Sequence, residues 1–559
     1  VARHVRTADW LEAHLDNHGT DLTDVVAHHR FTAYQTSVAL GLDTRPYAGP
    51  ALTALRRAAR RAAMLNAFDA ASAHLARASQ LVVSTVDSLG SAVVDQLGVE
   101  LLGIELSLHT DESGYLAGAG PARLAELATM LYRARDHDGA ARAWTLLGQT
   151  AWLRQDRAEA LRSLDRAVEL FDSCPDSPEK AQAYAELGRL HMLNYEHGPA
   201  LGAAQIAADI AERLDLVEMR AGALITIGMC RYLAGEPTGL VELRDALEFC
   251  RTQRLPSLRR ARGAVADALA EEGDLAGARA VLEGLSGQAS LEVLDAGGSL
   301  PAIEALYAGD WDRFLDVAES FLSTPDGSRD LRVRGARGWL RALRGDGEGA
   351  ESDATTVLRT ARSTGFWRPM WTALGNGAFA EAVLGRSDDA ERLLRELGES
   401  WRRMRTIASG AWVAAAAHAA TRVDPETALL LRDALGDAPH HTAWSRAAMS
   451  CVDGSLLAAK GEYVAAAMRY LDGAQRFADV GSTTDRMLAL GGVIRALSSA
   501  AEPRSGEGRA ASSAAAQLGT AADRTASAAA PAPTAEVPVA AVQNELTDFA
   551  RRNRIVSPW

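Results

Sequence analysis

The sequence predicts an all-α protein built from repeated helix pairs, on three observations. Strong helix formers such as alanine, leucine, arginine and glutamate dominate the chain, whereas aromatic residues make up only 6% of it. One residue pattern recurs in the middle of the chain at intervals of about forty residues. A glycine followed by a polar residue recurs between apolar helical stretches, where one helix would end and the next begin.

The recurring pattern is clearest in three segments, residues 141–171, 181–211 and 221–250. A glycine holds the eighth position of the first helix in each of them, where it lets the second helix approach closely. Small and apolar residues follow in the second helix. Each pair alone would leave an apolar face in water, so neighbouring pairs must stack. The residues of the pattern are Trp144, Leu147, Gly148 and Ala151, then Ala160, Leu164 and Ala167; Tyr184, Leu187, Gly188 and His191, then Ala200, Ala204 and Ala207; and Leu224, Ile227 and Gly228. This pattern is typical of a tetratricopeptide-like α-α superhelix, or solenoid.

Later segments keep the corner between the two helices. A glycine that ends one helix, followed by a residue able to cap the next, is the chemistry that a short helix corner requires. Small residues follow five positions after four of these glycines, at Ala278, Ala350, Ala390 and Ala466. We expect about eight or nine helix pairs in this part of the chain. The corners are Gly273-Asp274, Gly309-Asp310, Gly345-Asp346, Gly385-Arg386 and Gly461-Glu462.

The two ends differ from the repeats. Residues 1–80 have helical composition without the forty-residue pattern and are expected to form a separate N-terminal helical module, joined to the repeat array 141–495 by a helical connector, 81–140. Residues 496–540 are rich in alanine, serine and proline, too poor in large apolar residues to fold, and are expected to be a disordered linker. Residues 541–559 are expected to form a short C-terminal helix or tail.

Composition narrows the possible classes of protein. The net charge of −13 comes without a basic stripe, which argues against direct binding of nucleic acid. Four cysteines without a C-x-x-C spacing indicate free thiols in a reducing cytoplasm. No apolar run reaches the roughly 18 residues that a membrane span needs. We therefore expect a cytoplasmic protein.

Two N-terminal stretches carry a family resemblance. The sequence D-L-T-D-V-V-A-H-H-R-F-T-A-Y (Asp21–Tyr34) and the alanine-rich helix Leu55–Ala78 resemble the junction that follows the ATPase module in bacterial STAND-type regulators, including those with an adenylate/guanylate cyclase domain. In that family these helices lead into tetratricopeptide-like repeats. The resemblance implies that residues 1–80 follow an ATPase region that is missing here, and that the chain is the sensor arm. Such arms hold the ATPase inactive or receive a ligand or partner.

The chemistry of the resembled ATPase is not encoded in this chain. A P-loop needs G-x-x-x-x-G-K-[ST], whereas the only two lysines, Lys180 and Lys460, follow Glu179 and Ala459. Cyclase chemistry would need paired acidic metal ligands on a strand-rich scaffold, and no G-x-S-x-G motif is present for a serine hydrolase. We expect no enzymatic activity and no cofactor.

Histidine-containing stretches are the remaining candidates for a metal site. His28-His29 is interpreted as helix packing, because adjacent helical residues point about 100° apart. Asp136-His137-Asp138 is interpreted as a capping turn, and His440-His441 as an exposed loop. No metal site is expected.

The concave face of the repeats is the expected binding surface. In tetratricopeptide repeats, residues two, five, nine and twelve of the first helix project into the groove, and arginine and aromatic residues dominate binding hot spots. An alternative of equal weight is that Trp152 and Tyr232 only pack between repeats. The residues predicted to bind a partner are Arg142, Gln149, Trp152, Gln182, Arg189, Met192, Met229 and Tyr232.

The function expected from these observations is that of a non-catalytic helical-repeat sensor or scaffold. It would bind a protein or peptide partner in the concave groove, or regulate a STAND-type ATPase or cyclase signalling protein. One alternative is part of a STAND-type transcriptional regulator that binds DNA through another domain. Another is an enzyme on a helical toroid, which would need two carboxylates facing a pocket.

Overall fold

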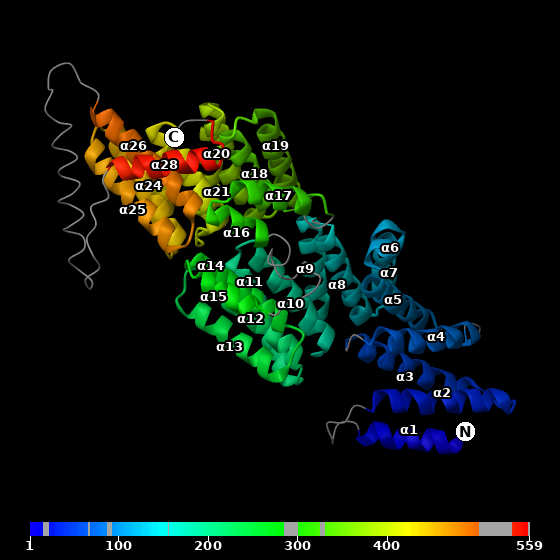
Figure 1. Cartoon of the computed structure of the whole chain (residues 1–559). Coiled ribbons are helices and arrows are strands. Elements are labelled where there is room, and N and C mark those ends of the chain that lie inside the picture. The colour runs from blue at the N-terminus through cyan, green and yellow to red at the C-terminus, as the bar shows by residue number, and fades with distance from the viewer. Residues whose placement is uncertain are drawn as a thin grey trace. The chain divides into compact units, whose positions relative to one another are not determined.

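The structure is a computed structural model that describes residues 1–14, 22–64, 67–85, 92–154, 156–283, 300–324, 330–501 and 539–556. Within these ranges every regular element is a helix (Figure 1). The prediction of an all-α, tetratricopeptide-like superhelix is confirmed. Most of the segment predicted to be disordered, residues 496–540, lies outside the described residues. Among the helices of the described part, none is both long and apolar enough to cross a bilayer.

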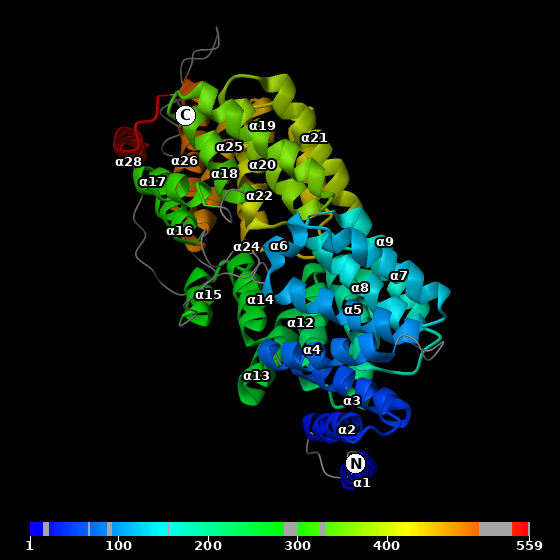
Figure 2. The same cartoon turned by 90° about the vertical axis from the view of Figure 1, so that its right-hand side faces the viewer.

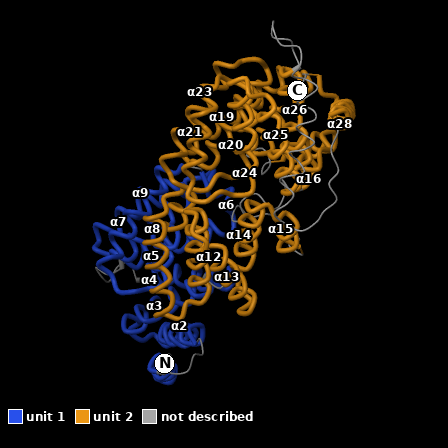
Figure 3. Tube along the Cα trace, turned by 90° about the vertical axis from the view of Figure 1, so that its left-hand side faces the viewer, with its two compact units in different colours: residues 1–186 blue, residues 187–559 orange. Residues whose placement is uncertain are grey.

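The chain divides into two compact units, Val1–Glu186 and Leu187–Trp559 (Figure 3). In the first unit each helix packs mainly against the next one along the chain. Its helices are α1 (Ala2–His14), α2 (Thr23–Ala39), α3 (Arg45–Met64), α4 (Phe68–Thr85), α5 (Ala92–Thr110), α6 (Glu112–Ala117), α7 (Gly120–Arg133), α8 (His137–Leu153), α9 (Arg157–Phe171) and the first part of α10 (Pro178–Leu193).

The second unit begins within α10 and holds the remaining helix pairs. They are α11 (His197–Arg213), α12 (Val217–Leu233), α13 (Thr238–Gln253), α14 (Leu258–Glu271), α15 (Leu275–Leu282), α16 (Leu300–Ala308), α17 (Trp311–Leu322), α18 (Leu331–Leu343), α19 (Gly347–Thr364), α20 (Trp367–Val383), α21 (Ser387–Met404), α22 (Gly410–Ala420), α23 (Pro425–Gly436), α24 (Ala443–Ala459), α25 (Tyr463–Asp479), α26 (Thr483–Ala501) and α28 (Val539–Arg552).

The corners between paired helices have the chemistry that the sequence predicts. All five predicted corner glycines adopt a positive φ, which for Gly345 is 84°. Only glycine enters this left-handed conformation without a steric penalty. At three corners the next residue, an aspartate, caps the following helix with its side chain: the carboxylate of Asp346 accepts a hydrogen bond from the Gly349 amide at 2.9 Å, and Asp274 and Asp310 do the same in their helices. At the other two corners, Arg386 and Glu462 make no such bond. The alanines five positions after four of the glycines are buried, as close helix contact requires.

The eighth-position glycines bring the two helices of a pair together. A Cβ placed on Gly188 in α10 would lie 2.9 Å from the backbone nitrogen of Ala204 in α11. A Cβ on Gly148 would lie 2.6 Å from Cγ of Leu164, and one on Gly228 would lie 3.1 Å from Cγ of Leu243. The three predicted pairs correspond to α8 with α9, α10 with α11, and α12 with α13. A larger residue at these positions would force the helices apart.

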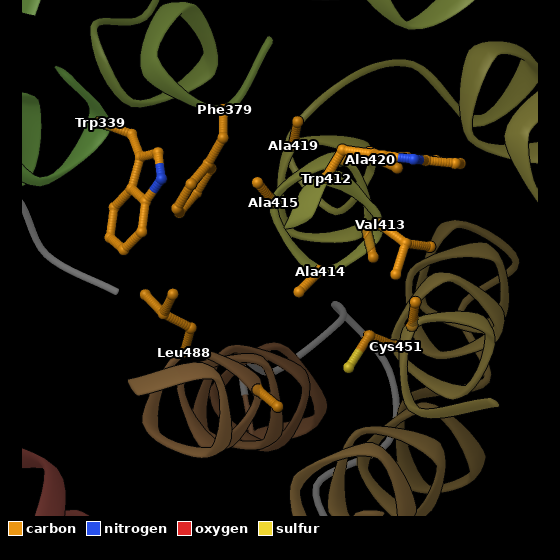
Figure 4. Packing of buried hydrophobic residues seen from close by; sticks show 14 of the residues in the cluster. Trp339, Phe379, Trp412, Val413, Ala414, Ala415, Ala419, Ala420, Cys451 and Leu488 are labelled. Atoms are coloured by element: carbon orange, nitrogen blue, oxygen red, sulfur yellow. The ribbon is translucent and has the colours of Figure 1, made fainter. Parts of the chain in front are cut away.

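Helix α22 is apolar on all sides and lies at the centre of the second unit's core. Every residue from Trp412 to Ala420 is buried, and α20, α24 and α26 pack around it. Figure 4 shows how the small side chains of its alanine run leave room for Phe379 of α20, Cys451 of α24 and Leu488 of α26. A helix that is hydrophobic all round must be enclosed by other helices, and alanine allows four backbones to come close.

Within the second unit, the end of one helix repeatedly meets the start of the helix ten places further along. The Trp367 amide at the start of α20 donates to Asn194 Oδ1 after α10, 173 residues earlier, at 3.2 Å. Before α22, Thr406 Oγ1 and the Ile407 amide both donate to the carbonyl of Leu233, the last residue of α12, at 2.8 and 3.0 Å. The spacing of 173 residues is the same in both contacts.

Two further contacts continue the series. Trp444 Nε1 in α24 donates to the Ala270 carbonyl in α14 at 2.9 Å, across 174 residues. Thr484 Oγ1 in α26 donates to the Leu306 carbonyl in α16, across 178 residues. The amide of Val556, after the end of α28, donates to the carbonyl of Leu343, the last residue of α18, at 2.9 Å, and so joins two helix ends. Five helix pairs therefore make one superhelical turn, and hydrogen bonds join each turn to the next. We call this line of contacts the seam.

Candidate functional site

None of the eight predicted partner-binding residues is fully exposed. Arg142, Met192, Met229 and Tyr232 are buried, with 5 to 7% of their surface accessible. Gln149 and Trp152 of α8 and Gln182 and Arg189 of α10 are half-buried. Gln182 and Arg189 stand two helical turns apart on one side of α10. Whether any of them binds a partner stays a prediction.

Arg142 belongs to a buried ion cluster in the first unit. Its Nη2 donates to Glu105 Oε2 in α5 at 2.9 Å, and its Nε lies 4.0 Å from Glu179 Oε1 in α10. Its Nη1 is buried and makes no hydrogen bond to any described residue. Breaking a buried ion pair leaves the other charge uncompensated, which is costly. Arg142 therefore has a structural role as the link between α5, α8 and α10.

Two more arginines from α3 extend this cluster. Arg56 Nη1 donates to Asp95 Oδ1 in α5 at 2.7 Å, and its guanidinium lies where a Cβ on Gly98 would stand. Burial, followed by the positive charge of Arg142, lowers the pKa of Arg60 to about 10. Burial and the carboxylate of Glu179 raise the pKa of Asp138. Charges of both signs thus lie close together between α3, α8 and α10.

Tyr232 and Met229 lie in the core of the second unit rather than in a groove. The single hydroxyl proton of Tyr232 is shared between the Ala268 carbonyl, 3.2 Å from Oη, and Glu272 Oε1, 3.1 Å from Oη, so Tyr232 links α12 to the end of α14. Burial, then the nearby charges of Glu271 and Glu272, raises the pKa of the Tyr232 hydroxyl. Met229 and Met192 pack in the same apolar cluster. Of the two interpretations of Tyr232, the structure favours packing between repeats.

One buried polar group in the seam is the carboxylate of Glu271, at the end of α14. It accepts hydrogen bonds from Ser409 Oγ at 2.5 Å and from the Gly410 amide at 2.7 Å, at the start of α22. A carboxylate at a helix N-terminus also meets the positive end of the helix dipole. Burial raises the pKa of Glu271, and the two hydrogen bonds only partly offset this effect.

Charged and aromatic side chains surround this carboxylate. Arg368 Nη2 of α20 lies 3.7 Å from Asp267 Oδ2 of α14, and both side chains remain more than a quarter exposed. Burial raises the pKa of Tyr195 to about 12, with Glu271 and Asp267 acting in the same direction and Arg368 opposing them. The ring of Tyr195 packs 4.9 Å from that of Trp371. The cluster holds the ends of α10 and α14 against the start of α20.

Sequence reasoning missed the role of His440. This residue was predicted to lie in an exposed loop, and its side chain is 40% exposed, but Nε2 lies 2.9 Å from Glu272 Oε1 across the seam. A buried counterpart is His418 in α22, whose Nε2 lies 3.0 Å from Asp485 Oδ1 in α26. No signal in the sequence links such pairs, because the partners are 168 and 67 residues apart.

The other histidine candidates behave as predicted. His29 Nδ1 lies 2.9 Å from His4 Nδ1, so it packs α2 against α1. Asp136 caps α8, its carboxylate accepting from the Gly139 amide at 2.9 Å. Within the ranges that the structure covers, no three histidine, cysteine or acidic side chains are placed to hold a metal ion. The polar groups of the seam are arranged to bind helix ends to one another.

Comparison with known proteins yields only distant structural likenesses. No protein-family model matches the sequence, and no curated protein sequence matches it. Among solved structures, the crystal structure of a Rap protein complexed with competence and sporulation factor is similar, with 15% sequence identity and a TM-score of 0.47. The match covers 63% of this chain and 98% of that one. At this identity and TM-score, the likeness assigns neither a family nor a partner to the chain.

Proposed function

We propose that this chain is a non-catalytic helical-repeat arm that binds a protein partner on the inner face of its helix pairs. The observation that carries the proposal is the contrast between two sets of inner positions. On α8 and α10, Gln149, Trp152 and Gln182 retain accessible surface, whereas Met229 and Tyr232, at positions nine and twelve of α12 in the second unit, are buried. Large side chains kept at a surface can be used for recognition.

The binding face would use the polar and aromatic side chains of α8 and of the first half of α10. Trp152 supplies a large amphipathic surface, and the amides of Gln149 and Gln182 can donate to and accept from a peptide backbone. Arg142 lies in the same row but is occupied by Glu105 and Glu179, so it would support the face from behind. The eight predicted residues are thereby divided into surface residues and supporting residues.

Site-specific photo-crosslinking tests this face. A benzophenone amino acid would replace Gln149, Trp152 or Gln182 in turn, and the matched control would replace Ala158, an exposed residue of α9. In the host cell we expect all three inner positions to capture the same protein and the control to miss it. Capture of different proteins from the three positions, or equal capture by the control, would refute a common binding face.

The finer proposal is that the partner is the ATPase half of a STAND-type regulator, in the cytoplasm. It is supported by the sequence resemblance of Asp21–Tyr34 and Leu55–Ala78, two stretches that lie largely on α2, α3 and α4. If the genomic DNA beside the codon for Val1 encodes a P-loop protein, its ATP hydrolysis should fall when this chain is present. A neighbouring P-loop ATPase whose rate is unchanged by the chain would exclude this partner while leaving the photo-crosslinking result intact.

A further inference from the structure

Helix α28 packs on the second unit as a ligand would, although it belongs to the same chain. It returns after residues 502–538 and lies beside α17 and α26 (Figure 2). Three of its apolar side chains, Val542, Leu546 and Phe549, are buried at a spacing of four and three residues, whereas Gln543, Asn544, Thr547 and Asp548 are exposed. This is the pattern of an amphipathic helix seated in an apolar groove.

The groove is built around Trp311, the first residue of α17. The ring of Phe549 packs edge-on against Trp311 at 5.4 Å, and Trp311 is completely buried. Phe549 also fills the space beside Gly309, where a Cβ would come within 2.9 Å of its ring. Because Gly309 has no side chain, the ring of Phe549 fits beside it, and the indole of Trp311 packs against the same ring.

Polar contacts fix the register of α28 in the groove. Near its middle, Arg486 Nη2 of α26 donates to Glu545 Oε2 at 3.0 Å. At its end, Asn553 Oδ1 accepts from the Trp311 amide at 3.1 Å, and thereby caps α17 from outside. The Val556 amide then donates to the Leu343 carbonyl. A helix terminus left without such partners would be satisfied by water or by another ligand.

Helix α28 lies outside the regular stacking of the seam. In the seam, the start of α20, α22, α24 or α26 meets the end of the helix ten places earlier. At α28 it is instead Val556, after the end of the helix, whose amide meets the end of α18. The contacts of α28 with α17 and α26 are therefore not a further step of the superhelix.

We propose that the groove on α17 and α26 is a binding site for an amphipathic helix of a partner protein, and that α28 is its built-in competitor. The partner helix has large apolar residues at the spacing of Val542, Leu546 and Phe549, an acidic residue that faces Arg486, and an asparagine one turn after the aromatic residue. Residues 502–538 add 37 positions between α26 and α28, a span of at most about 130 Å when extended. The covalent link therefore keeps α28 at a high local concentration beside the groove.

The test uses a labelled peptide of residues 539–556 and the full-length chain. The tethered helix competes with the peptide, so we expect only weak binding to the natural chain. A chain carrying both Leu546→Ala and Phe549→Ala should bind the same peptide at least tenfold more tightly, because its own helix no longer holds the groove. A chain carrying Asn544→Ala, which changes an exposed residue of α28, is the matched control and should behave like the natural chain.

Two results would overturn the proposal. One is equal binding of the peptide by all three chains, or binding by none of them. The other is a loss of helical circular dichroism in the doubly substituted chain that exceeds what one helix can account for, since α28 would then be an integral part of the fold.

A second measurement avoids core substitutions: a protease site placed within 502–538 should, once cut, release α28 on dilution, and added peptide should restore the complex. Retention of the cut helix through extensive dilution would contradict exchange.

Discussion

Replacing Gly188 by alanine tests the packing of the helix pairs, because the added methyl group meets backbone. It would lie 2.9 Å from the nitrogen of Ala204 and 3.2 Å from the carbonyl oxygen of Ala200, both in α11. Backbone atoms within a helix cannot move aside independently, so α10 and α11 must separate. Gly222 in α12 is the matched control: a methyl group there comes no closer than 3.6 Å, to Nη1 of Arg260, which is an ordinary contact.

The two substitutions share one favourable effect and differ in one unfavourable effect. Exchanging glycine for alanine inside a helix gains about 0.5–1 kcal/mol. Overpacking a close contact costs roughly 1–3 kcal/mol. Gly222→Ala should therefore stabilise the second unit by about 0.5–1 kcal/mol, whereas Gly188→Ala should leave it about 1–3 kcal/mol less stable than the Gly222→Ala variant.

Urea unfolding followed by far-ultraviolet circular dichroism measures this difference. Both glycines belong to the second unit, so both variants report on the same part of the chain even if the two units unfold in separate transitions. The comparison is between the free energies of unfolding of the two variants. If Gly188→Ala is as stable as Gly222→Ala, the eighth-position glycine is not what brings the paired helices together.

Three further predictions concern buried polar groups. Because burial raises the pKa of Glu271, its contribution to stability is fully present below the unfolded value of about 4.5 and is lost as the pH rises through the folded value. The stability of the natural chain relative to Glu271→Gln should therefore fall as the pH rises above about 4.5, and a constant difference would refute this. Tyr232→Phe removes the hydroxyl that is shared between the Ala268 carbonyl and Glu272, and it should lower the free energy of unfolding by about 0.5–1.5 kcal/mol in a urea titration. No loss would show that the hydroxyl is not needed between the repeats. Burial raises the pKa of Cys230 to about 12 and that of Cys250 to about 11, so few of these thiols are thiolates near neutral pH. Alkylation of the native chain should therefore modify the half-buried Cys174 before either of them, and mass spectrometry of the digested chain can check this order.

The sequence alone was sufficient to predict the helix pairs, for a local reason. Several corners carry a left-handed glycine and a capping residue side by side, as Gly345 and Asp346 do. The eighth-position glycines Gly148, Gly188 and Gly228 are likewise visible because they recur at a fixed interval. Because the same short-range contacts recur in every helix pair, the residues that make them recur at regular intervals in the sequence. This periodic pattern predicted the fold class.

The seam could not be predicted, because its partners are far apart in the chain and chemically ordinary. Nothing in the sequence joins Leu233 to Thr406 or Glu271 to Ser409, and carboxylates like that of Glu271 occur along the whole chain. The same limit applies to the candidate site. Helical periodicity places Met229 and Tyr232 in the inner row of α12, but whether that row faces solvent or the next helix depends on how tightly the superhelix coils. In the second unit it coils tightly, so these two side chains are buried.

Amide hydrogen exchange at Ile407 measures the seam most directly. Ile407 lies between α21 and α22, outside any helix, and its amide is bonded to the Leu233 carbonyl of the preceding superhelical turn. With successive turns joined as described, this amide should exchange as slowly as those inside the neighbouring helices. Exchange at the rate of an exposed loop, while α21 and α22 stay protected, would show that the turns of the second unit do not stack.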